Sequence, residues 1–266
     1  MRQALRHYLL ALQFFTRIPI TGRLAHWVGY SPALLRASAA HFPGVGWIVA
    51  GVAALVYAAL ALALAPKPWA SAVAAVFCTI ATVLLTGGFH EDGLCDVADG
   101  LGGSLARERA LEIMKDSRIG AYGAMALVLA LLAKVSLLAL LGAQSPAPAL
   151  AALAGAHVLS RLWPLLLVRT LVHVGDSARS KSKPLADQIS ASALAAAFLW
   201  CLMPLALVWW AQSALFLVAA CTLSALAAAW LAWRFARRLQ GYTGDCLGAV
   251  QQVGEIGFYL GAALAW

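Results

Sequence analysis

Charged residues are scarce in this sequence, and that scarcity limits the kind of protein it can be. Only 11% of the 266 residues are Asp, Glu, Lys or Arg, whereas a soluble domain carries roughly a quarter. The mean hydropathy is +0.83. Apolar runs of about 20 residues, long enough to cross a bilayer as helices, recur along the chain. They do not alternate as barrel strands do, so the sequence predicts an all-α polytopic membrane bundle.

Other absences narrow the function. The five cysteines are scattered without a Cys-x-x-Cys pair, so we expect small packing residues, not a zinc site or a disulfide framework. No internal repeat and no low-complexity linker divides the chain, and one domain over residues 1–266 is the simplest organisation. The sequence also lacks asparagine altogether.

The apolar runs predict about seven transmembrane helices. Their approximate ranges are 44–65, 70–88, 121–142, 149–172, 192–211, 213–233 and 246–265. The segment before them has one apolar helical face and one polar face. The apolar face carries Leu5, Tyr8, Leu9, Leu12 and Phe15, and the polar face carries Arg2, Arg6, Gln13 and Arg17. This pattern predicts an amphipathic helix lying at the membrane surface.

Basic residues are distributed unequally around these spans. Fifteen Lys and Arg fall in the N-terminal segment and after the second, fourth and sixth spans, whereas the opposite side has only Lys67. The group after the fourth span comprises Arg179, Lys181 and Lys183. The bias predicts a cytoplasmic N-terminus and an external C-terminus. It also accounts for the net charge of +8 through topology and anionic lipid headgroups, so we expect no nucleic-acid partner.

The acids are concentrated after the second span. Four of the eleven fall within nine residues of the stretch Thr86-Gly-Gly-Phe-His-Glu-Asp-Gly-Leu-Cys-Asp-Val-Ala-Asp-Gly-Leu-Gly-Gly103, namely Glu91, Asp92, Asp96 and Asp99. In a helix, the three aspartates at i, i+4 and i+7 share one face. Carboxylates so close repel each other unless a cation lies among them or some are protonated.

Hard carboxylate oxygens suit Mg²⁺, which usually bridges to substrate phosphates. Glycines such as Gly93 let a ligand approach the backbone closely. The stretch therefore predicts a magnesium and phosphate site, and a solvated loop is the alternative. Just downstream, Lys115, Asp116 and Arg118 place both signs of charge beside the acids. The two cations suit phosphate binding, and an ordinary surface helix is the alternative there.

A second group of polar residues opens the seventh span. One helical stripe carries Asp245, Gly248, Gln252 and Glu255. Gly244 precedes it, where a helix N-terminus offers free N–H groups to an anion. Glu255 lies about 15 Å along the axis from Asp245, inside the membrane, where it is expected to face the protein interior.

Three basic residues fall within predicted spans. Arg161 and Arg169 are eight residues apart, on one helical face of the fourth span, and are expected to face the acids or a phosphate. Pairing with Glu255 is the open alternative. Lys134 lies in the third span and is interpreted as structural.

These residues together resemble the cobalamin synthase family, adenosylcobinamide-GDP ribazoletransferase. The matching motifs run from end to end: Thr16-Arg-Ile-Pro19, Phe42-Pro-Gly-Val-Gly46, the acidic stretch from Thr86 to Gly100, Ile113-Met-Lys-Asp-Ser-Arg-Ile-Gly120, and Gly244-Asp-Cys-Leu-Gly-Ala249 followed by Glu255. Cys95 stands where the family pattern has alanine.

The resemblance implies the last assembly step of the cobalamin nucleotide loop. Such an enzyme transfers adenosylcobinamide phosphate from adenosylcobinamide-GDP to α-ribazole, or its 5′-phosphate, and releases GMP. It implies Mg²⁺ as cofactor and a bacterial inner membrane, with the active site cytoplasmic. Expected partners are the two substrates and membrane lipids. A homo-oligomer, or a complex with other nucleotide-loop enzymes, is left open.

The candidate residues receive roles in that chemistry as a hypothesis. Asp92, Asp96 and Asp99, with Asp245, are expected to bind Mg²⁺. Arg118 and Arg161 are expected to contact phosphate, and Asp116 or Glu91 to accept the proton of the ribose hydroxyl. The remaining substrate-binding candidates are Lys115, Gly93, Gly244 and Glu255.

Three other functions compete with this interpretation. A CDP-alcohol phosphotransferase also uses clustered aspartates, but its Ala-Arg element is missing and the spacing differs. A UbiA-type prenyltransferase uses an Asn-Asp-x-x-Asp-like motif, and this chain has no asparagine. A transporter usually has its site near the midplane between repeats, whereas here the acids gather towards one side.

Overall fold

The computed structural model describes residues 2–175 and 189–266. That part of the chain is helical and contains no β-strand, with one β-bridge between His173 and Tyr242. The predicted all-α class is therefore confirmed. The predicted basic group of Arg179, Lys181 and Lys183 lies outside the described residues.

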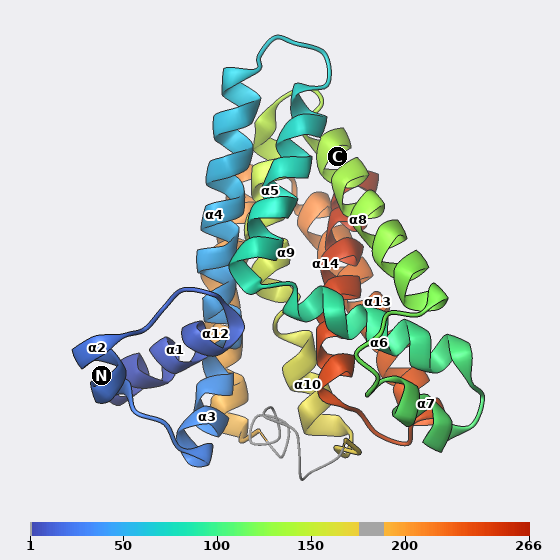
Figure 1. Ribbon diagram of the computed structural model, residues 1–266. Helices are drawn as coiled ribbons and strands as arrows, with labels where there is room; N and C mark the ends of the chain where they lie inside the picture. The colour runs from blue at the N-terminus through green and yellow to red at the C-terminus, as the bar shows by residue number, and fades with distance from the viewer. Residues whose placement is uncertain (1, 176–188) are drawn as a thin grey trace.

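The N-terminal segment forms helices at one side of the bundle (Figure 1). This group comprises α1 (Arg2–Phe15), α2 (Gly22–Val28), α3 (Pro32–Ser38) and a 3-10 turn (Ala39–His41). The rest are α4 (Phe42–Ala63), α5 (Ala70–Thr86), α6 (Phe89–Gly103), α7 (Arg107–Ile113), α8 (Ala121–Leu141), α9 (Pro146–Leu159), α10 (Trp163–Thr170), α12 (Ala191–Ala211), α13 (Ala214–Arg238) and α14 (Gly244–Leu264).

Each predicted span coincides with one of these helices, except the fourth, which is divided between α9 and α10. Within residues 2–175 and 189–266, five segments are long and apolar enough to cross a membrane: Pro32–Ala63, Ala121–Leu141, Pro146–Thr170, Ala191–Ala211 and Ala214–Arg238. The α5–α6 pair is a sixth if its 90° bend is counted within one span. Helix α14 is not among them, although most of it is buried. The polytopic membrane bundle is confirmed, and the count of seven is approximate.

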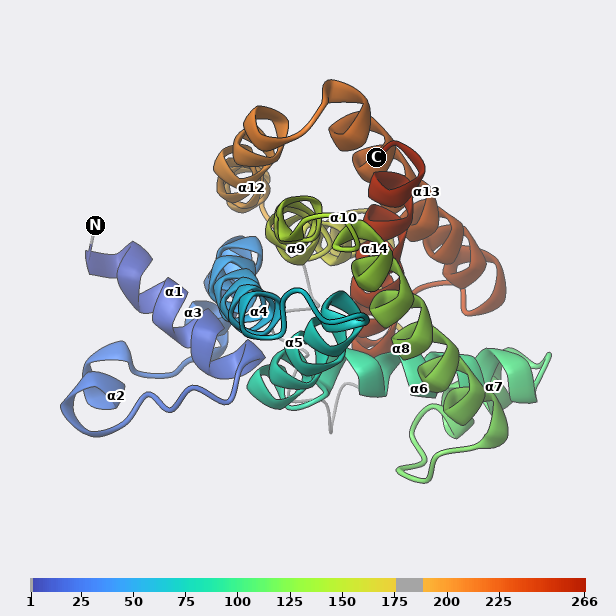
Figure 2. The same cartoon turned by 90° about the horizontal axis from the view of Figure 1, so that it is seen from above.

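The predicted amphipathic helix is α1, which packs against α3 and α4 at one side of the bundle (Figures 1 and 2). Leu12 and Phe15 are buried, whereas Leu5 at the other end is 51% exposed. The Arg6 guanidinium donates hydrogen bonds to the carbonyl oxygen of Val28 at 3.0 and 3.1 Å. The end of α1 is therefore fixed to the protein core.

Helices α1–α3, α6 and α7 gather at one end of the bundle, and the α4–α5 connection and the C-terminus lie at the other (Figure 1). Helix α14 runs between α8, α9 and α13 (Figure 2). Close packing there depends on missing side chains: a Cβ at Gly257 would lie 2.7 Å from the carbonyl oxygen of Leu223 in α13. Small residues let membrane helices approach in this way, which keeps Glu255 in the interior.

The fourth predicted span is broken into α9 and α10. Pro164 lies in the first turn of α10, and its missing N–H and bulky ring interrupt a continuous helix. Arg161 lies in the break, between Leu159 and Trp163. The break changes the helical register, so Arg161 is buried whereas Arg169 is exposed. The prediction that these two arginines share one face is therefore wrong.

Candidate functional site

A sharp turn places the acidic stretch across the end of the bundle. Gly87 and Gly88 adopt left-handed φ angles of 72° and 71°, which glycine tolerates because it has no Cβ. The turn ends α5 and starts α6 at 90° to it. The stretch from Asp92 to Asp99 is helical, which is the condition under which its aspartates were expected to share one face. Helix α6 carries them along the end of the bundle rather than through it.

A cleft of about 920 Å³ lies between the end of α1, the α5–α6 turn, α6, residues 117–119 and α8. This volume is typical of a ligand site. Apolar side chains of α8 and α1 form part of the wall. The polar and charged residues that line it are Gln13, Thr16, Arg17, Thr86, Glu91, Asp92, Asp96 and Ser117. Three of the predicted acids, Glu91, Asp92 and Asp96, therefore face one cavity.

Asp245 approaches these acids from the first turn of α14. Burial raises the pKa of Asp96 to about 7, helped by the negative charges of Asp245, Asp92 and Asp99. Contact between α6 and α14 depends on Gly93, because a Cβ there would lie 2.7 Å from the Asp245 carbonyl oxygen. The structure thus brings Asp92, Asp96 and Asp245 together. The missing side chain of Gly93 lets α6 and α14 come close enough for this.

Asp99 serves the fold in a different way. Its two carboxylate oxygens accept hydrogen bonds from the backbone N–H groups of Gly120 at 2.7 Å and Gly123 at 2.8 Å. These groups belong to the start of α8, where N–H groups have no partner within the helix. Asp99 is 8% exposed and does not line the cleft. The structure therefore shows Asp99 capping α8.

Asp116 and Arg118 bind each other outside the cleft. The Arg118 guanidinium donates to Asp116 at 2.7 and 3.0 Å, and both side chains are exposed to solvent. The hydrogen bonds from Arg118 lower the pKa of Asp116 to about 2. Neither residue is among those lining the cleft, and the same holds for Lys115. Ser117, between them, does line it.

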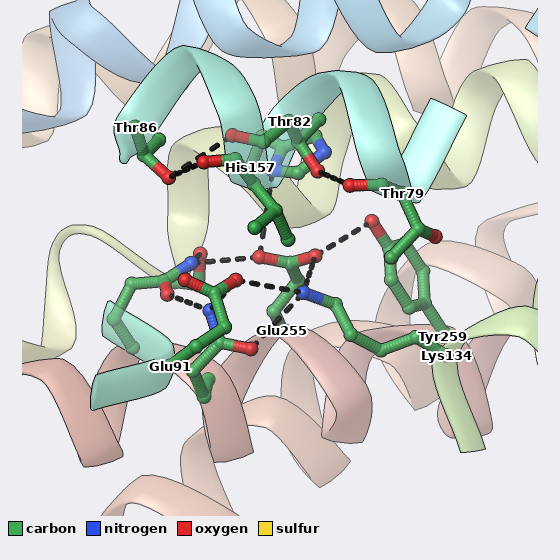
Figure 3. Close-up of polar contacts among 12 residues, drawn as sticks. Thr79, Thr82, Thr86, Glu91, Lys134, His157, Glu255 and Tyr259 are labelled. Carbon is green, nitrogen blue, oxygen red and sulfur yellow. Dashed lines mark hydrogen bonds and ion pairs between the residues drawn. The ribbon is translucent and has the colours of Figure 1, made fainter. Parts of the chain in front are cut away.

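Glu255 lies in a buried polar network (Figure 3). It is 2% exposed, and Lys134 Nζ lies 2.9 Å from its Oε1. Tyr259 donates to the same oxygen at 3.1 Å, and Gln251 donates to Oε2 at 2.7 Å. His157 Nδ1 lies 3.4 Å from Oε2. Glu255 faces the interior as predicted, but it does not line the cleft.

Gln252 joins this network to the cleft. Its side-chain amide donates to Glu91 Oε1 at 3.1 Å, and its oxygen accepts from Lys134 Nζ at 3.0 Å. Lys134 Nζ also lies 4.0 Å from Glu91 Oε1. Glu91 Oε2 is buried and has no hydrogen-bond partner within the described structure. Glu91 is thus among the residues that line the cleft, and its Oε1 is hydrogen-bonded to Gln252 in the protein interior.

Arg161 does not pair with Glu255, whose cationic partner is Lys134. The Arg161 guanidinium donates to the carbonyl oxygen of His157 at 2.6 Å and lies over the Phe42 ring, 5.8 Å from its centroid. It is 2% exposed and does not line the cleft. Gly244 lines a separate small apolar pocket with Phe42 and His90. Neither Arg161 nor Gly244 is therefore among the residues that line the cleft.

The sequence interpretation missed one charged residue of the cleft. Arg17 was assigned to the polar face of a surface helix, but it lines the cleft. Its place in the motif Thr16-Arg-Ile-Pro19 was the available signal, since that motif forms part of the family resemblance. Lys134, interpreted as structural, is buried and pairs with Glu255, and it does not line the cleft. Its contacts with Gln252 and Glu91 have no signal in the sequence.

The carboxylates of the cleft fit a Mg²⁺ ion that is bound by few protein ligands. Residues 2–175 and 189–266 contain no group of three or more His, Cys, Asp or Glu arranged to hold a metal ion. Magnesium does not require such a cage, because it keeps several waters and binds through one or two carboxylates plus substrate phosphates. Asp92 and Asp96 offer two carboxylates at the cleft wall, and neither forms an ion pair in the described ranges.

Fold and site together define a polytopic helical membrane protein with a carboxylate-lined cleft at one end of its bundle. The model of the family described as cobalamin-5-phosphate synthase matches residues 7–263, and the chain belongs to this family. The resemblance predicted from the motifs is therefore confirmed, which disfavours the phosphotransferase, prenyltransferase and transporter alternatives.

Relatives of this chain carry the name adenosylcobinamide-GDP ribazoletransferase. The protein of Polaromonas naphthalenivorans is 61% identical, and the alignment covers 100% of both chains. That of Leptothrix cholodnii is 49% identical over 96% of this chain and 94% of its own. That of Vibrio cholerae is 40% identical over 98% and 94%. No solved structure matches the chain. These names identify a family of transferase enzymes.

Proposed function

We propose that this protein catalyses the reaction for which its relatives are named, in the cleft along α6. The hydroxyl oxygen of α-ribazole, or of its 5′-phosphate, forms a bond to the phosphorus on the cobinamide side of the diphosphate in adenosylcobinamide-GDP. The phosphoanhydride bond breaks, GMP leaves with the bonding electrons, and the hydroxyl loses its proton. The observation that carries the proposal is that Glu91, Asp92 and Asp96 line one large cleft.

Asp92 and Asp96, with Asp245 beside them, are the residues that would hold Mg²⁺. The ion would neutralise the diphosphate and help the leaving nucleotide depart. The crowding of these carboxylates supports the assignment, since the charges of Asp245 and Asp92 contribute to the raised pKa of Asp96. Asp99 is better assigned to the capping of α8 than to the metal, because both of its oxygens already accept backbone hydrogen bonds.

Glu91 is the better candidate to accept the hydroxyl proton. Asp116 is already bound by Arg118 outside the cleft. Glu91 is among the residues that line the cleft, and its buried Oε2 has no hydrogen-bond partner in the described structure. Gln252 fixes the other oxygen. Phosphoryl transfer depends mainly on positioning and charge, so Glu91 is expected to contribute through the position of its carboxylate.

The site is proposed to face the cytoplasm of a bacterial cell, at the inner membrane. The helices that carry the cleft gather at the end of the bundle that also receives the N-terminal segment (Figure 1). That end has the basic residues of α1, α2 and α3, whereas Lys67 lies in the α4–α5 connection at the other end. This asymmetry is typical of cytoplasmic orientation.

The proposal is tested with purified protein in lipid nanodiscs. Adenosylcobinamide-GDP and α-ribazole are supplied with Mg²⁺ or with EDTA, and GMP release is followed over time. We expect release with Mg²⁺ and none with EDTA, restored when Mg²⁺ is added back. Absence of release from well-folded protein under both conditions would contradict the proposed reaction. Equal release under both conditions would preserve the reaction and contradict the metal.

A further inference from the structure

Arg17 is held at the mouth of the cleft by backbone hydrogen bonds. Helix α1 ends at Phe15, and the Thr16 hydroxyl donates to the carbonyl oxygen of Leu12 at 2.7 Å. The same hydroxyl accepts from the N–H of Ile18 at 3.2 Å. The backbone N–H of Arg17 donates to the Leu85 carbonyl oxygen near the end of α5 at 2.7 Å. The position of Arg17 is therefore set by α1 and α5 together.

The side chain of Arg17 lies against the turn that starts α6. A Cβ placed on Gly87 would contact Arg17 Nε and would lie 2.8 Å from its Cζ. Only a glycine at this turn leaves space for the guanidinium. The same turn leads into the acids of α6, so Arg17 and the carboxylates of Asp92 and Asp96 border one cleft.

The cleft combines opposite charges that do not touch. Among the described residues lining it, Arg17 is the single Lys or Arg. No ion pair joins Arg17 to Glu91, Asp92 or Asp96 in the described ranges. An exposed arginine without a carboxylate partner, in the same cleft as carboxylates that suit a divalent cation, is suited to bind an anion that also binds that cation. A diphosphate bound to Mg²⁺ is such an anion.

We propose that Arg17 is a substrate-binding residue that holds the diphosphate of a nucleoside-diphosphate ester. The inference rests on the proposed function and replaces two earlier candidates for phosphate binding, since Arg118 pairs with Asp116 outside the cleft and Arg161 is buried elsewhere. The planar guanidinium can donate two parallel hydrogen bonds to phosphate oxygens, which an ammonium group cannot reproduce.

The first test separates the two substrates kinetically. Arg17→Gln is expected to raise KM for adenosylcobinamide-GDP by about 10- to 100-fold and to leave KM for α-ribazole within about twofold. Arg17→Lys should fall between the wild type and Arg17→Gln, because it retains the charge without the fork. Arg23→Gln is the matched control, since Arg23 is an exposed arginine of α2 away from the cleft. Unchanged KM values for Arg17→Gln would overturn the inference.

A second test displaces the Arg17 guanidinium without replacing Arg17. Gly87→Ala and Gly88→Ala carry nearly the same backbone strain, because both glycines have φ near 70°, but only Gly87 has Arg17 against it. We expect Gly87→Ala to raise KM for adenosylcobinamide-GDP several-fold more than Gly88→Ala at equal thermal stability. Equal effects of the two substitutions would show that the guanidinium position is unimportant.

Direct binding distinguishes failure of this inference from failure of the proposed reaction. Radiolabelled GDP is used as probe, with Mg²⁺, on wild type, Arg17→Gln and Arg23→Gln in nanodiscs. We expect the affinity for GDP to fall about 10- to 100-fold in Arg17→Gln alone. If wild type bound GDP through Arg17 but released no GMP from adenosylcobinamide-GDP, the proposed reaction would be contradicted. The role of Arg17 in binding a diphosphate would be supported. Binding of GDP that is absent, or independent of Arg17, would overturn the inference.

Discussion

Lys134 Nζ lies 2.9 Å from Glu255 Oε1, and the two side chains are 3% and 2% exposed. They belong to α8 and α14, so the pair joins two helices in the interior of the bundle. Ionisable groups inside a membrane protein usually pair with one another. Tyr259 and Gln251 also donate hydrogen bonds to the Glu255 carboxylate. Together these contacts stabilise its negative charge in the protein interior.

Removing one partner of this pair should destabilise the protein strongly. Lys134→Met leaves Glu255 without its cation, and an unpaired buried charge costs about 3–5 kcal/mol. The measurement is thermal unfolding in nanodiscs. Lys67→Met, on the exposed α4–α5 connection, is the control and should unfold like wild type. The double variant Lys134→Met with Glu255→Gln should recover part of the loss, and wild-type stability of the single variant would contradict the assignment.

Glu91 should affect turnover more than binding. Glu91→Gln keeps the shape of the side chain but cannot accept the hydroxyl proton, so we expect kcat to fall by about 10- to 100-fold, at or below the lower end of general-base effects. The affinity for GDP with Mg²⁺ should change little. Glu108→Gln, whose side chain is 80% exposed in α7, is the control. A Glu91→Gln variant with full kcat would exclude Glu91 as the base.

Replacing Asp99 should lower the stability of the protein without changing its Mg²⁺ requirement. Asp99→Ala removes both acceptors from the start of α8, and loss of such a cap costs about 0.5–2 kcal/mol. We expect a lower unfolding temperature and an unchanged dependence of the remaining activity on Mg²⁺ concentration. The assay is a Mg²⁺ titration of GMP release below the unfolding temperature. A raised Mg²⁺ requirement at wild-type stability would return Asp99 to the metal site.

Gly93 should be sensitive to a single methyl group. Gly93→Ala places a Cβ 2.7 Å from the Asp245 carbonyl oxygen and 3.1 Å from its Cα, so α6 and α14 must separate. Overpacking of this kind costs about 1–3 kcal/mol and should also lower activity by moving Asp245 away from Asp96. Gly51→Ala on α4 is the control, since a Cβ there meets no atom within 4 Å. Full activity of Gly93→Ala would show that Asp245 is not needed.

The fold was largely predictable because apolar length is a local property. Each predicted span is helical, and only the fourth is broken into two helices, since an apolar run of about 20 residues spans the bilayer and a helix satisfies its backbone hydrogen bonds. The two bends were not predicted. The turn at Gly87 and Gly88 depends on left-handed φ angles, and the break at Arg161 depends on where Pro164 falls in the helix. Neither changes the hydropathy of the chain.

The site was predictable where charge density alone revealed it. Asp92 and Asp96 were found because acids are rare elsewhere, and both line the cleft. Asp99 lies on the same short helix but turns to α8, which depends on the neighbouring helix. The pairing of Lys134 with Glu255, and the position of Arg17 against Gly87, join segments distant in the sequence. Packing decides such contacts, so helical periodicity could not predict them.

The most direct test of the central claim compares three aspartates under one assay. GMP release is measured in nanodiscs for Asp92→Asn, Asp96→Asn and Asp116→Asn, each first shown to unfold near the wild-type temperature. The account predicts a loss of about 100-fold or more for the two residues that line the cleft, typical of removing groups that stabilise transition-state charge. Asp116→Asn should stay within a few-fold of wild type. Wild-type release by the two cleft variants, or an equal loss in all three, would contradict the account.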